Sequence, residues 1–156
     1  NHKNHILSES IAPVNLVERF GPAHAHVDST AIDMATTLAK SVKLVGLAAL
    51  ELFVSKDGEV FANEIAPRTH NSGHWTMDGC NISQFEQHIR AISGLPILKP
   101  IAHSEVTMIN LIGDDVKTLD AYYGRADAAI HLYGKAESRE GRKMGHINIT
   151  KPLEKK

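Results

Sequence analysis

The sequence predicts an α+β fold in which antiparallel strands and helices form a first part and a small β-rich barrel or sandwich forms a second part. Two apolar runs flank an Asp-Gly pair, which is the strongest short-range hairpin signal. Two other stretches repeat apolar residues at helical spacing. Beyond the proline-containing segment 95–100, short apolar runs follow without a helical period. We place the boundary so that residues 1–97 form the first part and residues 98–156 the second.

The first part begins with extended segments and a helix. Residues 6–11 and 15–20 are expected to be extended. Asp28 or Ser29 has the chemistry of an N-cap, and the helix that follows is expected to run to about Val42. Its apolar face should belong to the core and consists of Ala31, Ile32, Ala35, Leu38, Ala39 and Val42.

A second helix is expected after residue 81. Asn81 is the expected cap, and Gly94 with Pro96 ends the helix. The side chains expected to face inward are Ile82, Phe85, Ile89 and Ile92, and those expected to face water are Glu86, His88 and Arg90. We assign no cofactor role to the apolar face of the first helix.

The hairpin between the two helices brings two acids together. If Asp57 and Gly58 form a two-residue loop, Glu51 lies directly opposite Glu64. Opposed side chains have Cβ atoms about 4.5–5.5 Å apart, and the repulsion is on the order of 3 kcal/mol at an effective dielectric near 20. A cation between them is therefore expected, and carboxylates without nearby cysteine suit Mg²⁺. Alternatively one glutamate is solvated, a lysine or arginine bridges them, or a bulge or one-residue slip separates them.

A polar cluster follows the hairpin. Pro67 ends the strand, and the next seven residues include Arg68, His70, Asn71, Ser72 and His74. Arg68 suits bidentate binding of a carboxylate or phosphate, and His70 and Asn71 offer further donors. A polar surface loop is the alternative. The i, i+4 spacing of His70 and His74 also suggests zinc on a helix, but Pro67 and a nearby glycine argue against a helix there.

The second part contains three expected strands and a charged connection. The strands span residues 106–112, 129–133 and 146–150. Residues 134–145 carry the cations of the connection, which are Lys135, Arg139, Arg142 and Lys143. Spacing alone favours a solvated hairpin tip for them.

Composition excludes several classes of protein. The net charge of −1 gives no electrostatic case for nucleic acid, and no apolar run approaches the roughly 20 residues of a membrane span. Cys80 is the single cysteine, so no internal disulfide is expected, and a reducing cytosol fits. A structural thiol is a better interpretation of Cys80 than a nucleophile.

Several motifs together resemble the N5-carboxyaminoimidazole ribonucleotide synthases, which are ATP-grasp ligases and form the ATPase subunit of phosphoribosylaminoimidazole carboxylase. The motifs are Ala49-Leu-Glu-Leu-Phe53, Asn63-Glu-Ile-Ala-Pro-Arg-Thr-His-Asn-Ser-Gly-His-Trp75, Ile82-Ser-Gln-Phe-Glu86, Met108-Ile-Asn-Leu-Ile-Gly113 and Gly141-Arg-Lys-Met-Gly-His146. The resemblance covers nearly the whole chain. It implies a purine-biosynthetic reaction in which ATP and bicarbonate yield carboxyphosphate, which carboxylates the exocyclic amine of aminoimidazole ribonucleotide.

The resemblance also implies roles for individual residues. Glu51 and Glu64 match the glutamates that bind Mg²⁺ with ATP, and Asn63 is near them although the two-residue loop directs it to the other face. Arg68, His70 and Asn71 match residues that hold bicarbonate or the carboxylated group near the imidazole. The residues that match or adjoin cations at the ribonucleotide phosphate are Lys135, Arg142 and Lys143.

A complete member is more than twice as long and adds an N-terminal α/β domain and a central lobe that clamps ATP. We interpret this chain as the second half of the ATP-grasp fold plus a C-terminal module, whose partners are those lobes and a second copy in a homodimer. By itself the chain is expected to have negligible turnover. The alternatives are another ATP-grasp carboxyligase, which should lack the His-Asn-Ser-Gly-His-Trp run of residues 70–75, and a non-enzymatic module.

Overall fold

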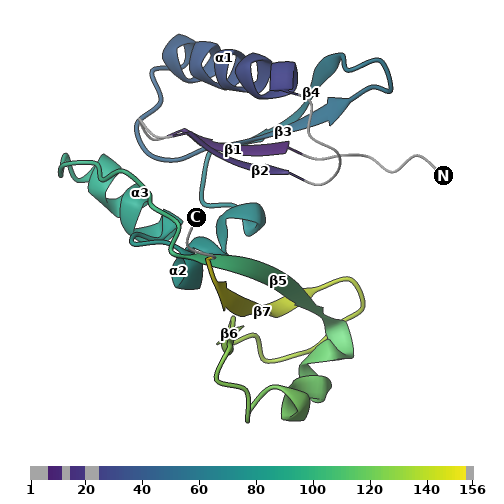
Figure 1. Cartoon of the computed structure of the whole chain (residues 1–156). Helices are drawn as coiled ribbons and strands as arrows, with labels where there is room; N and C mark the ends of the chain where they lie inside the picture. Colours follow the sequence, from purple (N-terminus) through teal and green to yellow (C-terminus); the bar gives the residue numbers. More distant parts are fainter. Residues whose placement is uncertain (1–6, 12–14, 20–24, 154–156) are drawn as a thin grey trace. The chain divides into compact units, whose positions relative to one another are not determined.

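The computed structural model describes residues 7–11, 15–19 and 25–153 (Figure 1). The chain divides into two compact units. The first unit consists of Asn1–His74 and Ile82–Pro100, and the second of Trp75–Asn81 and Ile101–Lys156. Among the described residues, no helix is both long enough and apolar enough to cross a bilayer.

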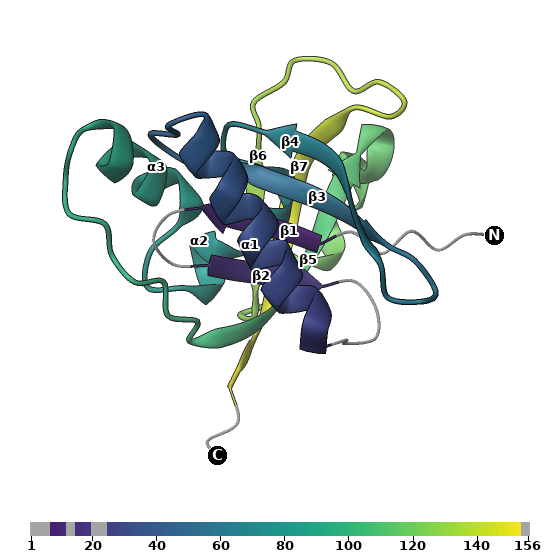
Figure 2. The ribbon, with the colours of Figure 1, turned by 90° about the horizontal axis from the view of Figure 1, so that it is seen from above.

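The first unit contains a four-stranded antiparallel sheet. Its order is β2-β1-β3-β4, formed by Asn15–Arg19, Leu7–Ile11, Ala49–Val54 and Val60–Ala66. Helix α1, Ala25–Ser41, packs on this sheet and crosses its strands (Figure 2). A short 3₁₀ turn η1, Asn71–Gly73, and helix α3, Gln84–Ile92, complete the unit. The sheet carries Glu51 and Glu64, so its register decides how the two acids meet.

The core of the first unit lies between α1 and the sheet. Ala31 and Ala35 from the helix and Leu50 and Leu52 from β3 are buried together. The partly buried residues packed around them are Met34, Leu38, Val54 and Val60. The alanines allow the helix and the sheet to approach closely, and this part of the predicted helical face is confirmed.

The ends of α1 differ from the prediction. The helix begins at Ala25, one turn before the expected cap, so Asp28 and Ser29 lie within it. Asp and Ser are both favoured at helix caps, and Asp is also favoured in the first helical turn. The sequence pattern alone therefore does not tell a cap from a first-turn position. Val42 is 57% exposed and lies beyond the helix, so its assignment to the core was wrong.

The β3–β4 hairpin has a three-residue loop in place of the expected two-residue loop. Ser55 pairs with Glu59, and the Gly58 N–H donates to the Ser55 carbonyl over 3.1 Å. Gly58 has φ +84°, the left-handed conformation that closes a three-residue hairpin loop and that glycine adopts without steric cost. Val54 therefore faces Val60, one residue away from the expected register.

A β-bulge then restores the expected pairing. The register shifts between Leu52, which faces Ala62, and Glu51, which faces Glu64, so Asn63 is the extra residue. The loop and the bulge each displace the pairing by one residue, and the two displacements cancel. The predicted opposition of Glu51 and Glu64 is confirmed, although the predicted loop was wrong.

Helix α3 also differs from the prediction. Ser83 caps it, since its Oγ accepts a hydrogen bond from the Glu86 N–H over 3.2 Å. The expected cap, Asn81, instead accepts a hydrogen bond from the Ile101 N–H over 2.7 Å. Ile82 is buried as expected, whereas the exposed fractions of Phe85, Ile89 and Ile92 are 39%, 55% and 52%. The buried side chains of the helix are Gln84 and Gln87, because their amides bind backbone groups and so tolerate burial.

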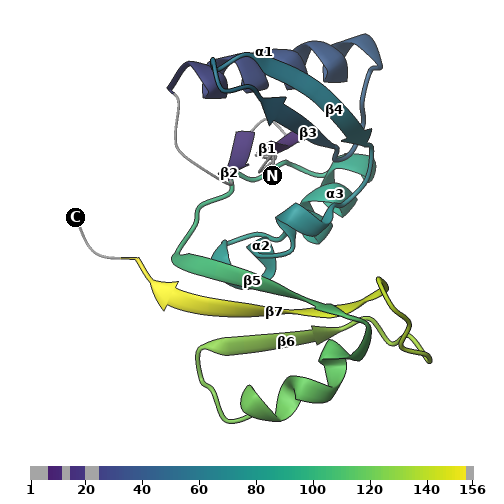
Figure 3. The ribbon, with the colours of Figure 1, turned by 90° about the vertical axis from the view of Figure 1, so that its right-hand side faces the viewer.

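The second unit is built on a three-stranded antiparallel sheet (Figure 3). Its order is β5-β7-β6, formed by Ser104–Ile112, Lys143–Pro152 and Ala128–Leu132. Helix α2, Thr76–Gly79, and the 3₁₀ segment η2, Gly113–Ala121, pack against it. The buried apolar residues are Leu111, Leu119 and Ile147. The α+β class and the antiparallel sheets are confirmed, and the β-rich module takes the form of one three-stranded sheet within the described residues.

Candidate functional site

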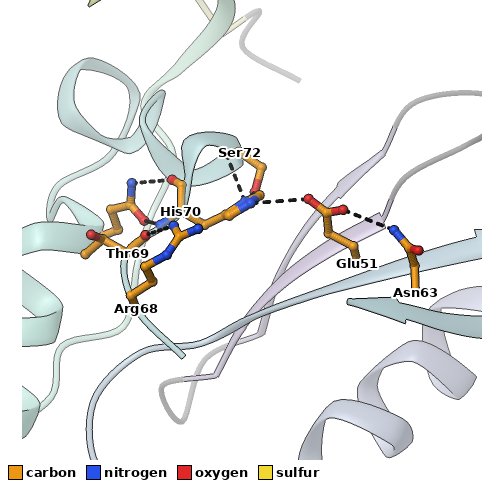
Figure 4. Close-up of polar contacts among 7 residues, drawn as sticks. Glu51, Asn63, Arg68, Thr69, His70 and Ser72 are labelled. Atoms are coloured by element: carbon orange, nitrogen blue, oxygen red, sulfur yellow. Dashed lines mark hydrogen bonds and ion pairs between the residues drawn. The ribbon is translucent and has the colours of Figure 1, made fainter. Parts of the chain in front are cut away.

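The carboxylate of Glu51 is the centre of the candidate site (Figure 4). Its Oε1 lies 3.2 Å from Nε2 of His70, and its Oε2 accepts a hydrogen bond from Nδ2 of Asn63 over 3.3 Å. The Glu51 and His70 side chains are only 19% and 17% exposed. Strand β3, strand β4 and the segment after β4 thus bring an acid, an amide and an imidazole together.

Asn63 reaches this site because of the bulge. A regular two-residue hairpin would have turned its side chain to the face opposite Glu51. Asn63 is the extra residue of the bulge, so its side chain does not follow the alternation of the regular strand. It therefore contacts the Glu51 carboxylate. The expectation that Asn63 points to the other face was therefore wrong.

Glu64 faces Glu51 directly and is exposed. Directly opposed residues of two antiparallel strands direct their side chains to one face, so the two carboxylates share a side of the sheet. Within the described residues, no group of three His, Cys, Asp or Glu side chains could hold a metal ion by itself. Two carboxylates alone fit Mg²⁺, which binds one or two of them and takes its other ligands from phosphates and water.

Two nitrogens contact the Glu51 carboxylate, Nε2 of His70 and Nδ2 of Asn63. Among the described interactions, no arginine bridges the two glutamates. Arg68 instead donates from Nη1 to the carbonyl of Thr69 over 2.9 Å. The structure thus brings Glu51 together with Asn63 and His70, places Glu64 across from Glu51, and leaves Arg68 at the exposed edge of this segment.

The tautomer of His70 follows from its neighbours. The Ser72 N–H donates to Nδ1 of His70 over 3.3 Å, and the Ser72 hydroxyl lies 2.9 Å from the same nitrogen. Since a backbone N–H can only donate, Nδ1 acts as an acceptor and the ring proton resides on Nε2. Nε2 lies 3.2 Å from Oε1 of Glu51, so His70 presents a protonated nitrogen to the acid site.

Asn71 follows His70 in the η1 turn. Its Oδ1 is buried and has no hydrogen-bond partner among the described residues. Because a buried acceptor without a partner costs about 1–3 kcal/mol, this oxygen is a candidate for receiving a ligand N–H.

The His74 ring contacts Gln84, which also binds the backbone of His70. Nδ1 of His74 lies 2.7 Å from Nε2 of Gln84, and the ring stacks on Phe85 with centroids 5.4 Å apart. The i, i+4 spacing of the two histidines falls on an extended residue and a 3₁₀ turn, so it does not place them on one face of an α-helix.

Gln84 is a residue of the site that the sequence analysis missed. Its Oε1 accepts a hydrogen bond from the His70 N–H over 2.9 Å, and its Nε2 donates to the His70 carbonyl over 2.7 Å. The only sequence signal was its place in the Ile82-Ser-Gln-Phe-Glu86 motif.

Of the predicted cations of the second unit, Lys135 and Arg142 lie in the connection between β6 and β7, and Lys143 is the first residue of β7. Nζ of Lys135 donates to the carbonyl of Lys143 and lies 5.6 Å from the ring centroid of Tyr133. Nη1 of Arg142 donates to the carbonyl of Glu137 over 3.2 Å. Backbone carbonyls thus hold the side chains of Lys135 and Arg142.

A polar network that the sequence analysis missed lies in the second unit. Oδ2 of Asp78 accepts hydrogen bonds from Nε2 of His131 over 2.8 Å and from Nδ2 of Asn148 over 2.6 Å. His131 stacks on His146, and Nδ1 of His146 lies 2.9 Å from the Tyr133 hydroxyl. Burial raises the pKa of Tyr133, so the hydroxyl keeps its proton at neutral pH.

Cys80 follows helix α2 as its C-cap and is 7% exposed. Burial raises its pKa from 9.0 to about 11. Since the thiolate is the nucleophilic form, Cys80 is a structural thiol at neutral pH.

Comparison with known families shows to which protein family the chain belongs. Residues 1–85, which include the acid hairpin and the His70 segment, match the ATP-grasp domain. The chain belongs to the ATP-grasp family. Residues 106–156 of this ATP-grasp chain match the phosphoribosylaminoimidazole carboxylase C-terminal domain.

Two curated relatives of this ATP-grasp chain carry the same name. The chain is 47% identical over 151 residues to N5-carboxyaminoimidazole ribonucleotide synthase of Brucella melitensis, a match that covers 97% of the chain and 40% of the relative. It is 44% identical over 154 residues to the Bacillus subtilis enzyme of that name, covering 98% of the chain and 39% of the relative. The chain thus spans about two fifths of the length of these relatives.

Solved structures agree with these relatives. An ADP complex of an N5-carboxyaminoimidazole ribonucleotide synthetase matches with a TM-score of 0.82 and 34% identity, covering 96% of this chain and 45% of that one. The Aspergillus clavatus synthase in complex with ADP and 5-aminoimidazole ribonucleotide matches with a TM-score of 0.74 and 29% identity, covering 96% and 47%. The resemblance stated from the sequence motifs is confirmed.

Proposed function

We propose that this ATP-grasp chain forms the acid-hairpin part and the C-terminal module of an N5-carboxyaminoimidazole ribonucleotide synthase. In the proposed reaction a bicarbonate oxygen attacks the γ-phosphorus of ATP, and ADP leaves. The carboxyphosphate then gives its carboxyl group to the exocyclic amine of aminoimidazole ribonucleotide, which loses a proton, and phosphate is released. The names of the relatives and the ligands of their solved structures support this proposal.

Glu51 and Glu64 would hold Mg²⁺, with the amide of Asn63 beside them. When bound, the ion would neutralise the charge of the ATP phosphates during phosphoryl transfer. Their opposition across β3 and β4 supports this assignment, since it places two hard oxygen ligands on one face. Nε2 of His70 lies 3.2 Å from Oε1 of Glu51 and so helps to orient that carboxylate.

The residues after β4 would bind the small anion and the amine. His70 presents a donor, and Arg68 lies at the exposed edge of the same segment, where its guanidinium can clamp bicarbonate or the carboxyl group. The buried Oδ1 of Asn71 would accept an N–H from the exocyclic amine. Holding both reactants in this way lowers the entropic cost of the transfer.

The second unit would bind the ribonucleotide phosphate. Lys135 and Arg142, with Lys143 beside them, supply the positive charge, and the backbone carbonyls that bind Lys135 and Arg142 keep these side chains along the connection. We further propose that the complete enzyme carries additional lobes that bind ATP, forms a homodimer and works in the cytosol. The length of the relatives supports the additional lobes.

The opposition of Glu51 and Glu64 beside His70 is the observation that carries the proposal. The test is a chimera in which this chain is joined to the part of the Brucella melitensis enzyme that it does not match. We expect the chimera to release ADP only when bicarbonate and aminoimidazole ribonucleotide are both present, and to incorporate labelled bicarbonate. Glu64→Gln should abolish both signals. ADP release that ignores the ribonucleotide, or that survives Glu64→Gln, would contradict the proposal.

A further inference from the structure

We propose that Gln84 is a positioning residue that fixes His70 beside Glu51. The expected effect of Gln84 on turnover rests on the proposed function, whereas the fixing of His70 by Gln84 does not. Gln84 itself makes no contact with Glu51 among the described interactions, and it acts through the backbone of His70.

The Gln84 side chain pairs with His70 as one peptide group pairs with another. The Gln84 amide accepts a hydrogen bond from the His70 N–H and donates one to the His70 carbonyl. Two directly opposed residues in an antiparallel sheet exchange the same pair of hydrogen bonds. Nε2 of Gln84 also lies 2.7 Å from Nδ1 of His74. A single side chain that is 6% exposed therefore holds both ends of the segment 70–74.

This backbone clamp complements the contacts of the imidazole ring. His70 is extended, with φ −127° and ψ 154°, and Ser72 contacts Nδ1 of its ring. With the main chain held by Gln84 and the ring held by Ser72, Nε2 stays 3.2 Å from Oε1 of Glu51. Loss of the clamp would leave the N–H and carbonyl of a part-buried residue to find new partners, and the ring would move with them.

Gly73 makes room for the clamp. A Cβ atom at residue 73 would lie 2.6 Å from Oε1 of Gln84, closer than two such atoms can approach. A side chain there would push the amide away from His70. The glycine of the Asn-Ser-Gly-His motif is thus explained by the close approach of Gln84, and Gly73→Ala offers a second way to disturb the same contact.

Gln87 provides a matched control on the same helix. It is 3% exposed, its Oε1 accepts from the Leu98 N–H over 3.3 Å, and its Nε2 donates to the Leu98 carbonyl. Gln84 and Gln87 therefore make the same two-bond contact with a backbone residue. Only Gln84 makes it with a residue of the candidate site, so the two differ in position and not in chemistry.

The first experiment measures turnover in the chimera. Methionine keeps the length of glutamine and removes the hydrogen bonds, so Gln84→Met and Gln87→Met should lower the unfolding temperature to a similar extent. We expect Gln84→Met to lower kcat by about a hundredfold, as misplaced catalytic groups do, and Gln87→Met to change it less than about twofold.

Gly73→Ala should lower kcat as Gln84→Met does, with no additional loss when the two are combined. In a His70→Ala chimera, Gln84→Met should cause no further loss. Equal effects of Gln84→Met and Gln87→Met on kcat, or a further loss without His70, would overturn the inference.

The second experiment uses the 156-residue chain and needs no turnover. Amide hydrogen exchange of His70 should be slow in the unmodified chain and in Gln87→Met. It should be at least about tenfold faster in Gln84→Met, since the acceptor of that N–H is gone. Gln84→Glu retains an acceptor and should keep the protection, which covers the case in which Gln84→Met does not fold. Unchanged exchange in a folded Gln84→Met, or lost protection in Gln84→Glu, would overturn the inference. An inactive chimera with this exchange pattern would count against the proposed reaction and not against the clamp.

Discussion

The imidazole rings of His131 and His146 are stacked, with centroids 4.6 Å apart and an interplanar angle of 20°. They connect Asp78, which accepts a hydrogen bond from His131, to Tyr133, whose hydroxyl lies next to His146. His146 is 1% exposed, and Asn148, which donates to the same Asp78 oxygen, is 0% exposed. One carboxylate therefore orders polar side chains from both β6 and β7 inside a small sheet.

Asp78→Ala should destabilise the chain. The donors of His131 and Asn148 would lose their acceptor, at a cost of about 1–3 kcal/mol in the free energy of unfolding. Urea denaturation measures this change. Asp120→Ala removes an exposed carboxylate from the same unit and should change the free energy by less than about 0.5 kcal/mol. Equal effects of the two substitutions would show that the network does not stabilise the fold.

Glu64→Gln should separate folding from magnesium binding. The substitution removes one of two opposed like charges, so thermal unfolding without metal should occur at the same or a higher temperature. Mg²⁺ with ADP should raise the unfolding temperature of the unmodified chain more than that of Glu64→Gln. Glu59→Gln changes an exposed acid of the same hairpin and should keep the response to Mg²⁺ and ADP. An undiminished response in Glu64→Gln would remove Glu64 from the proposed metal site.

The isolated chain should show negligible turnover. The proposed reaction requires ATP to be enclosed, and the chain spans about two fifths of the length of its relatives. The measurement is ADP release by the purified chain with ATP, bicarbonate and aminoimidazole ribonucleotide, with the chimera as the positive control. Release that depends on the ribonucleotide would refute this prediction.

Cys80 should make the fold sensitive to alkaline pH. Its folded-state pKa is raised from 9.0 to about 11, so folding favours the protonated thiol. This contribution is fully present below pH 9 and is lost as the pH rises through about 11. The free energy of unfolding should therefore fall over this range, and Cys80→Ala should reduce the fall. The raised pKa of Tyr133 acts in the same direction, so part of the fall should remain. An identical pH dependence in Cys80→Ala would contradict the assignment.

Local sequence patterns predicted the acid pair, the fold class and most strands, because apolar alternation and an Asp-Gly turn are local signals. They did not predict the bulge at Asn63, since one extra residue in a strand leaves no mark in such a pattern. They also placed the apolar residues of α3 in the core, where Gln84 and Gln87 lie instead. Whether a glutamine can be buried depends on the backbone group that its amide binds, and that group belongs to another segment of the chain.

Contacts between distant segments explain the other omissions. Asp78 and His131 are 53 residues apart in sequence, and Asp78 and Asn148 are 70 residues apart. Neither pair shows a spacing that a helix or a hairpin would reveal. The roles of Lys135 and Arg142 came from the family resemblance, because the spacing of these cations alone favoured a solvated tip.

The bulge at Asn63 makes the hairpin tolerant of a change in length at that position. If Asn63 were absent, Leu52 would still face Ala62, and the next residue along β4 would be Glu64, again across from Glu51. A one-residue deletion there would thus spare the two carboxylates and remove only the amide.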